Sequence, residues 1–295
     1  MIQACALGKL LRGKEIVVGD YVTLEKIADG EEYQIAAVEE RKSEIFRVIV
    51  RENKKKVTAA NCDLMIILTS VSKPEFKRGI VDRFLVRAYQ WGIEPVVVFN
   101  KMDEFDTQEM DFSFEVDRLS LLGIKCYEVS AKFEDYKIRF LNLGISDLKN
   151  YIKNKTSIFL GQSGVGKSKM ISALSDGEIK LLSQQVGRAG KGSHTTTWSE
   201  IVECDSFSTI DSPGIRSFSL EDISPDDLLT FFPDLVEIAC QCKFNNCSHD
   251  EKTKGCAFWK LDQNDRNTAL IMSRLDSYLR IYSEISETPQ WAKKR

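Results

Sequence analysis

Gly161-Gln-Ser-Gly-Val-Gly-Lys-Ser168 fits the pattern G-x-x-x-x-G-K-[ST], directly after an apolar run, Ser157–Leu160, and before a helical pattern, Lys167–Leu174. Glycines in such a loop let backbone N–H groups surround phosphate oxygens, and the helix that follows adds the positive end of its dipole. We expect Lys167 to reach the β- and γ-phosphates and act in catalysis, and Ser168 to ligate Mg²⁺. A plain glycine turn is the alternative. The residues expected to bind the phosphates are Gly161, Gln162, Ser163, Gly164, Val165, Gly166, Lys167 and Ser168.

Two shorter motifs identify the base. Asn100-Lys-Met-Asp103 follows an apolar strand, and the Asp103 carboxylate offers two acceptors to the N1–H and N2–H₂ donors of guanine, whereas adenine has no such pair. Lys101 would lie along the base plane, and Asn100 would brace the loop. After the next strand, Ser130, Ala131 and Lys132 form an S-A-K loop whose backbone N–H is expected to meet guanine O6. Either motif alone could be a solvated turn, but with the phosphate loop they predict GTP.

Two further segments complete a nucleotide switch. Asp211-Ser-Pro-Gly214 follows another strand; we expect Asp211 to hold Mg²⁺ through water and the Gly214 N–H to contact the γ-phosphate. The loop Gly190–Thr197 contains the histidine His194 and a threonine ligand for Mg²⁺, which the sequence leaves open between Thr195 and Thr196. An exposed loop position is the alternative for His194.

The order of these motifs is unusual. A Ras-like GTPase runs from the phosphate loop through the threonine switch and D-x-x-G to N-K-x-D and S-A-K, whereas this chain begins with N-K-M-D and S-A-K. The cyclic order is kept and the starting point has moved, which predicts a circularly permuted P-loop GTPase of the doubly wound α/β class. The segment after Gly214 is then covalently coupled to the nucleotide switch.

The segments before and after the predicted GTPase domain have different patterns of secondary structure. Four short strands are predicted in the first sixty residues, about one fewer than a small barrel needs, and Asn53–Lys56 reads as a polar junction. After Ser224 the strands stop, and Leu270–Ser286 carries a helical apolar stripe. The four predicted strands are Ile16–Val18, Tyr21–Leu24, Tyr33–Val38 and Ile45–Val50.

A cysteine cluster predicts a metal. Cys242, Cys247, His249 and Cys256 supply three thiolates and an imidazole, a set that suits tetrahedral Zn²⁺ and leaves no open position, so one structural zinc per chain is expected. Cys240 competes for one ligand position, and unligated buried cysteines are the alternative.

Composition excludes some classes of protein. The longest apolar runs, Leu64–Leu68 and Pro95–Phe99, are too short to span a bilayer, and Lys9 interrupts any signal-peptide core, so we expect a cytoplasmic protein without a membrane partner. The net charge of −3 conceals a gradient: residues 1–60 carry 11 Lys and Arg against 10 Asp and Glu, residues 242–295 carry 10 against 7, and the middle carries 20 against 27. Such ends permit contact with nucleic acid without proving it.

Together these motifs resemble the ribosome small-subunit-dependent GTPases of the RsgA/YjeQ family, above all in the loop G-x-G-x-H-T-T and the zinc spacing. The resemblance, which also includes Val18-Gly19-Asp20, implies an OB-type β-barrel over 1–60, a permuted GTPase domain over 61–223 and a helical zinc domain over 224–295. The start of the chain is short for that family, and the first barrel strand is expected to be missing.

By the same resemblance, the function is GTP hydrolysis to GDP and phosphate, stimulated by the small ribosomal subunit during its late maturation. The two end domains would contact ribosomal RNA. Ile215 stands where Ras-like enzymes have a glutamine that orients water, and His194 is the candidate substitute. We expect a monomer with slow intrinsic turnover, because no arginine finger is evident.

Three alternatives remain open at this point. A permuted GTPase could serve the large subunit, although the zinc cluster and the β-rich start argue against it. An RNA-binding zinc protein could use GTP only as a sensed ligand. A P-loop ATPase would let ATP compete with GTP, which the Asp103 carboxylate opposes.

Overall fold

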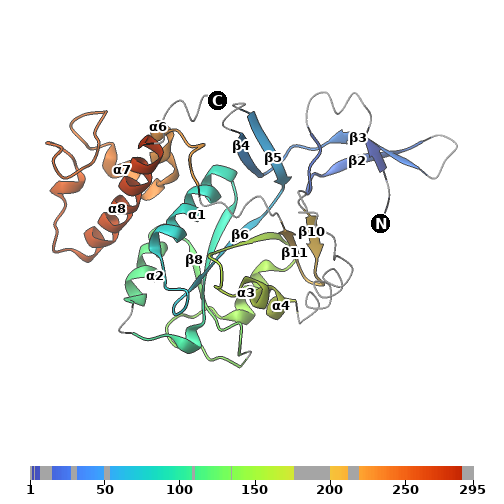
Figure 1. Ribbon diagram of the computed structural model, residues 1–295, viewed down its shortest axis with the longest axis horizontal. Helices are drawn as coiled ribbons and strands as arrows, with labels where there is room; N and C mark the ends of the chain where they lie inside the picture. The colour runs from blue at the N-terminus through green and yellow to red at the C-terminus, as the bar shows by residue number, and fades with distance from the viewer. Residues whose placement is uncertain are drawn as a thin grey trace.

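The computed structural model describes residues 2, 4–6, 15–27, 32–49, 54–107, 110–133, 135–175, 200–211 and 219–287. A six-stranded sheet with helices on both faces forms its centre; N-terminal strands lie on one side and C-terminal helices on the other (Figure 1). The predicted α/β alternation followed by a helical C-terminal region is confirmed. None of the helices in this described part of the chain combines the length and apolar character that a membrane span requires.

The central sheet has the strand order β10-β11-β9-β6-β7-β8, in which only β10 runs antiparallel to its neighbour. Every residue of β6 is buried, as expected for a parallel strand covered on both faces. The register pairs Ser70 with Asn100 and Ile67 with Leu160, so the carboxyl ends of β6, β7 and β9 meet at one edge. The strands are β6 (Leu64–Ser70), β7 (Glu94–Asn100), β8 (Lys125–Glu128), β9 (Thr156–Leu160), β10 (Glu200–Glu203) and β11 (Ser208–Asp211).

Two helical layers cover this sheet. Alternate residues of β6 face opposite sides: Met65 and Ile67 pack with α1 and α2, whereas Leu64 and Ile66 pack with α3 and α4. The helices are α1 (Arg78–Trp91), α2 (Phe112–Ser120), α3 (Ile145–Ile152) and α4 (Lys167–Leu174), with a short 3₁₀ turn η2 (Met102–Glu104) after β7.

The N-terminal region corrects the expected strand count. Among the described residues there are five strands rather than four, in two sheets ordered β1-β3-β2 and β4-β5. The predicted strand Ile16–Val18 contributes only an isolated bridge from Val18 to Ala59. The strands are β1 (Ala4–Ala6), β2 (Val22–Lys26), β3 (Tyr33–Val38), β4 (Glu44–Ile49) and β5 (Lys54–Ala60).

The polar junction predicted at Asn53–Lys56 is wrong, because Lys54–Lys56 begins β5 opposite the end of β4. Lysine side chains are compatible with a strand whose outer face is solvated. Lys55 also gains partners there: its Nζ lies 2.5 Å from a Glu44 carboxylate oxygen and 4.0 Å from the centre of the Phe46 ring.

Val18-Gly19-Asp20 has a structural role at the base of these strands. Gly19 has a φ of 89°, and a Cβ there would lie 2.0 Å from the Ala60 carbonyl oxygen, so only glycine fits. Asn61 Nδ2 donates to the Gly19 carbonyl at 2.8 Å, and Arg41 Nε donates to Asp20 Oδ1 at 2.6 Å. The motif therefore attaches the N-terminal strands to the chain that enters β6.

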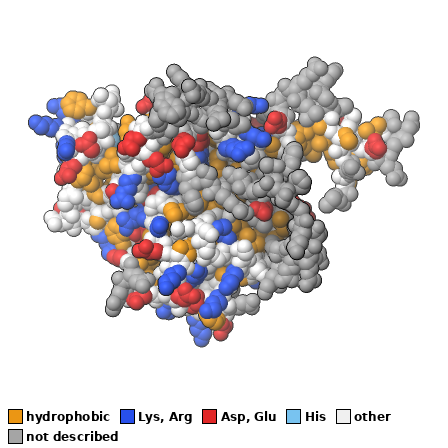
Figure 2. All heavy atoms as spheres, viewed as in Figure 1, with side chains coloured by type: hydrophobic (Ala, Val, Ile, Leu, Met, Phe, Trp, Pro, Cys, Tyr) orange, Lys and Arg blue, Asp and Glu red, His pale blue; other side chains and the backbone are white. Residues whose placement is uncertain are grey.

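The C-terminal helices pack against α1 and α2. Their core includes Val86 from α1 together with Phe232, Phe258 and Leu275. The elements are α6 (Pro225–Leu228), η4 (Leu229–Phe231), α7 (Pro233–Ala239), η5 (Phe258–Lys260) and α8 (Arg266–Glu287). On the face shown in Figure 2, acidic and basic side chains are interspersed rather than separated by sign.

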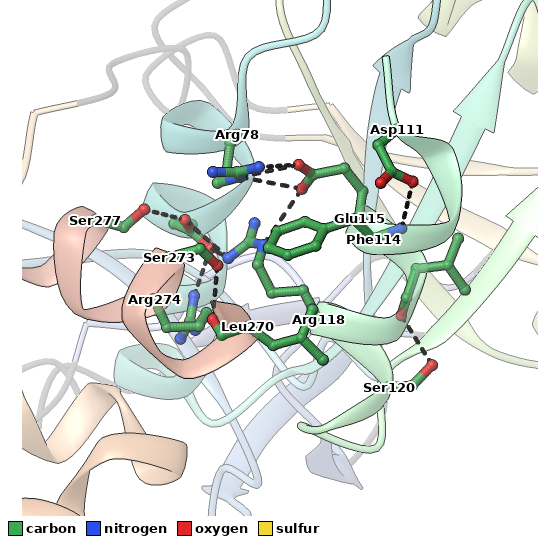
Figure 3. Close-up of polar contacts among 12 residues, drawn as sticks. Arg78, Asp111, Phe114, Glu115, Arg118, Ser120, Leu270, Ser273, Arg274 and Ser277 are labelled. Atoms are coloured by element: carbon green, nitrogen blue, oxygen red, sulfur yellow. Dashed lines mark hydrogen bonds and ion pairs between the residues drawn. The ribbon is translucent and has the colours of Figure 1, made fainter. Parts of the chain in front are cut away.

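A buried ion network joins these two parts (Figure 3). Asp82 of α1 is fully buried; Arg118 Nη1 of α2 donates to it at 2.9 Å, Arg274 of α8 donates to the same oxygen, and Ser277 Oγ donates to the other at 2.5 Å. Arg274 Nε also pairs with Asp234 of α7 at 2.8 Å. One carboxylate thus connects three helices from distant parts of the sequence.

We expect Asp82→Asn to lower the free energy of unfolding by about 3–5 kcal/mol, because two buried guanidinium groups would lose their shared counter-charge. Urea denaturation at neutral pH measures this. The matched control is Asp276→Asn on α8, whose exposed pair with Arg280 (3.0 Å) should contribute less than about 0.5 kcal/mol. Equal denaturation midpoints for Asp82→Asn and the wild type would contradict the role of the network.

The same network predicts acid sensitivity. Burial by itself raises the pKa of Asp82, but Arg274, Arg118 and the Ser277 hydroxyl outweigh it, so the pKa lies below its ordinary value. The carboxylate therefore stabilises the fold above the pKa of an unfolded aspartate, about 3.9, and this contribution is lost as pH falls through the lower folded pKa.

Candidate functional site

The phosphate loop lies at the edge where the central strands end. It connects β9 to α4, and Gly164 and Gly166 have φ values of 83° and 99°, in the region that favours glycine. A Cβ at Gly166 would lie 2.6 Å from Asn100 Nδ2, and one at Gly161 would lie 2.2 Å from the Leu68 carbonyl oxygen. The glycine spacing therefore also lets the loop approach the two neighbouring strand ends.

Lys167 folds back over the loop. Its Nζ donates to the carbonyl oxygens of Gly161 (2.7 Å) and Gln162 (3.1 Å), so the ammonium group lies against the loop backbone. Ser168 follows in the first turn of α4. An anion bound here would contact the backbone N–H groups of the loop, the N-terminus of α4 and the charge of Lys167.

Asn100 connects all three predicted nucleotide loops. Its Nδ2 donates to the Val165 carbonyl in the phosphate loop at 2.8 Å, and its Oδ1 accepts from the Ala131 N–H at 2.9 Å. Asn100 is 2% exposed, so water does not compete for these bonds. Lys101 adds a second connection, because its Nζ donates to the Gly164 carbonyl at 3.0 Å and to the Lys73 carbonyl.

Asp103 carries an unpaired carboxylate oxygen. Its Oδ1 is buried and accepts no hydrogen bond from the described residues. A buried acceptor without a partner is costly, and an incoming pair of N–H donors would remove that cost. The N1–H and N2–H₂ edge of guanine supplies such a pair.

The S-A-K loop lies beside the base-recognition loop, Asn100–Asp103, and its two N–H groups are held differently. The N–H of Ala131 is already directed to Asn100, and the N–H of Lys132 makes only a long 3.4 Å bond to Ser130 Oγ. Of these two N–H groups, the one of Lys132 is therefore more readily available to guanine O6.

The switch residues divide between described and undescribed parts of the chain. Asp211 is the exposed last residue of β11, paired in register with Glu200. His194, Thr195, Thr196 and Gly214 lie outside the described residues.

The structure brings the four predicted zinc ligands together. Their ligand atoms all lie within 4.8 Å of one another. Cys242 Sγ lies 3.6 Å from His249 Nδ1 and 4.0 Å from Cys256 Sγ, close to the roughly 3.5–3.8 Å edges of a tetrahedral zinc site with such ligands. Cys240 is exposed and outside this group. The donor set and its spacing are compatible with zinc.

The ligands are fixed to the C-terminal core. The His249 ring contacts Phe258 and Tyr278 edge-on, at centroid distances of 5.2 and 6.1 Å, and Trp259 Nε1 donates to the His249 carbonyl at 3.0 Å. Burial lowers the pKa of His249 and raises the pKa of Cys256 to about 11. A metal would therefore meet a neutral imidazole and would displace the thiol proton.

The sequence analysis missed Glu128 and Arg139. Glu128 ends β8 fully buried, and Arg139 Nη2 donates to the Met102 carbonyl, inside the base-recognition motif, at 2.5 Å. An acidic residue at the buried end of the short strand β8 is a signal that could have identified the first. Arg139 lies in a loop without a comparable signal.

Comparisons with known proteins agree with this geometry. A family model of RsgA GTPases matches residues 38–221. The small ribosomal subunit biogenesis GTPase RsgA of Flavobacterium psychrophilum is 34% identical over 92% of this chain and 82% of its own length. That of Borrelia recurrentis is 29% identical over 97% of this chain and 88% of its own.

Solved structures give the same result. YjeQ from Thermotoga maritima aligns with a TM-score of 0.72 at 27% identity, covering 98% of this chain and 91% of that one. YloQ, a circularly permuted GTPase, aligns with a TM-score of 0.69 at 25% identity, covering 98% and 87%. With its phosphate loop, base-recognition loop and motif order, the chain belongs to the RsgA family of circularly permuted GTPases.

Proposed function

We propose that this GTPase acts on the small ribosomal subunit during its late maturation, and that the subunit stimulates GTP hydrolysis. The observation that most supports GTP binding is the meeting of the phosphate loop with Asn100 and the unpaired Asp103 oxygen at one edge of the sheet. The relatives are named small ribosomal subunit biogenesis GTPases, and these names indicate the small subunit as the partner.

At this site Lys167 neutralises charge on the β- and γ-phosphates, while Asp103 and the S-A-K loop hold guanine. Ser168, Asp211 and one of Thr195 and Thr196 would hold Mg²⁺, which supplies charge neutralisation at the phosphates when bound. Gly214 would donate its N–H to the γ-phosphate. His194 would orient the attacking water in place of a glutamine.

The flanking regions would contact ribosomal RNA. The proposed division is an RNA-binding barrel over 1–60, the GTPase over 61–223 and a zinc domain over 224–295. In the last, one structural Zn²⁺ would be held by Cys242, Cys247, His249 and Cys256. Exposed Phe244 and Trp259 lie in this zinc segment, where aromatic side chains could stack on unpaired bases. A monomer in the cytoplasm fits this role.

Phosphate release from GTP tests the proposal, measured without ribosomes, with small subunits and with large subunits. We expect slow intrinsic turnover and strong stimulation by small subunits alone. Equal stimulation by both subunits would contradict the assignment to the small one, and negligible turnover in every condition would indicate a GTP sensor.

Two variants test the proposed roles of Lys167 and His194 in hydrolysis. Lys167→Ala should abolish stimulated turnover by removing the phosphate-binding charge. His194→Ala should bind GTP normally and lose the stimulated rate. A His194→Ala protein that keeps the stimulated rate would remove His194 from the mechanism.

A further inference from the structure

Selective binding of guanine requires an oriented Asp103 carboxylate. The side chain has one buried oxygen that no described residue holds, so its direction depends on the backbone that carries it. That backbone is the three-residue 3₁₀ turn η2, whose own bonds are Glu104 N–H to the Lys101 carbonyl at 2.9 Å and a long one, Phe105 N–H to the Met102 carbonyl at 3.4 Å. Hydrogen bonds in such turns have poor geometry, so a contact from another part of the chain can hold the turn more firmly.

Arg139 holds the peptide group that leads into Asp103. Its Nη2 donates to the Met102 carbonyl oxygen at 2.5 Å, and that carbonyl belongs to the same peptide unit as the Asp103 nitrogen. On the other side, the Met102 N–H donates to the Val129 carbonyl at 3.1 Å. Rotation of the Met102–Asp103 peptide would break the bond to Arg139.

Glu128 in turn anchors the loop that carries Arg139. Its carboxylate accepts four hydrogen bonds, from the Tyr136 hydroxyl (2.6 Å) and from the N–H groups of Arg139 (2.8 Å), Phe140 (2.8 Å) and Leu141 (2.7 Å). Glu128 has no exposed surface, so water does not compete for these bonds. Glu128 also lies two residues before Ser130, so its side chain links the loop that carries Arg139 to the S-A-K loop.

Two further contacts hold the loop and the turn together. The Phe140 ring meets Phe105, which directly follows η2, edge-on at 5.3 Å, and the Arg139 guanidinium lies 5.1 Å from the Phe140 ring centre. Arg139 Nε also donates to the Tyr136 hydroxyl at 3.2 Å. The guanidinium is thus oriented by an aromatic face, a hydroxyl and a carbonyl together.

We propose that Arg139 is a positioning residue for guanine selectivity: held by Glu128 and Tyr136, it fixes the peptide before Asp103 so that both carboxylate oxygens meet N1–H and N2–H₂ of the base. This inference rests on the proposed function, in that Asp103 contacts guanine. Arg139 is not among the residues proposed to contact phosphate or base. Its loss should therefore weaken recognition of the base edge and leave phosphate binding intact.

The test compares the dissociation constants of GDP and IDP, which lacks only the 2-amino group. The wild type should bind GDP on the order of 10–100-fold more tightly, the effect of one hydrogen bond to a charged group. Arg139→Ala should reduce that ratio to roughly threefold or less while the thermal midpoint stays near the wild-type value. Arg139→Lys keeps the charge but not the planar guanidinium with its several donors, and it should recover part of the GDP-to-IDP preference.

Two more variants separate positioning from general loop damage. Tyr136→Phe removes only the hydroxyl between Glu128 and Arg139, should reduce the ratio less than Arg139→Ala, and should add nothing in the Arg139→Ala background. The matched control is Lys137→Ala, which deletes an exposed positive charge from the same loop and should keep the wild-type ratio.

The outcomes are distinct. An unchanged GDP-to-IDP ratio in Arg139→Ala overturns the inference and leaves the proposed function standing. Equal losses for GDP and IDP with a lowered thermal midpoint also overturn it, because Arg139 would then only maintain the fold of the loop. A wild type that does not distinguish GDP from IDP would instead remove Asp103 as the base contact and with it the guanine site.

Discussion

Removing the proposed zinc is expected to unfold the segment between α7 and η5 and to lower the free energy of unfolding by on the order of 5 kcal/mol. The four ligands lie within 15 residues, Cys242 to Cys256, that form turns and contain no regular helix or strand. Without the metal, the segment would keep the packing of His249 on Phe258 and Tyr278 and a few turn hydrogen bonds, such as Lys243 N–H to the Gly255 carbonyl at 3.0 Å. Metal analysis together with thermal unfolding, before and after chelation, measures the effect.

The neighbouring cysteine provides the matched control. Cys247→Ser should lower the zinc content and the thermal midpoint, whereas Cys240→Ser, at an exposed position in the same segment, should keep one zinc per chain. GDP affinity should change little in either variant, because the nucleotide loops lie on the central sheet. A Cys247→Ser protein with full zinc content and an unchanged midpoint would contradict the four-ligand site.

Local pattern is sufficient for the elements that build the nucleotide site. The sequence predicts the helix Lys167–Leu174 with the bounds that α4 has, because a glycine loop and an apolar strand precede it. The strands β6 and β7 are apolar runs buried on both faces, and such runs are visible without knowledge of their partners. The permutation follows from the order of the motifs along the chain, which requires no knowledge of contacts between them.

The rest depends on contacts between distant residues. Lys54–Lys56 is polar enough to resemble a junction, and only its pairing with β4 makes it a strand. Asp82 is one acidic residue in an amphipathic helix; its partners Arg118 and Arg274 are 36 and 192 positions away. Arg139 escapes sequence analysis because its bond to the Met102 carbonyl, 37 positions away, is to a backbone group and leaves no residue pattern.

The Asp103 carboxylate is expected to decide which base the protein binds. In Asp103→Asn the side chain keeps its shape but presents an N–H₂ group where one acceptor oxygen was, so it would oppose a donor of guanine. We expect the affinity for GDP to fall on the order of 10³-fold, about 4 kcal/mol, through two lost charge-assisted hydrogen bonds and one donor facing another. Titration of GDP, XDP and ADP against both proteins measures the change.

The Asp103→Asn variant should gain affinity for a xanthine nucleotide. Xanthine keeps N1–H but carries a carbonyl at C2, so the amide of the Asp103→Asn variant can accept from the first and donate to the second, and XDP should bind the variant more tightly than GDP does. Glu104→Gln is the matched control: it neutralises the next carboxylate of the same turn, whose Oε2 accepts from the Ser72 hydroxyl at 2.7 Å, and should leave the GDP affinity within about twofold. If Asp103→Asn binds GDP as tightly as the wild type, the buried oxygen does not contact the base. A loss for GDP and XDP alike would instead mean that Asp103 maintains the turn η2, whereas an exchange of preference follows only from direct contact with the base edge.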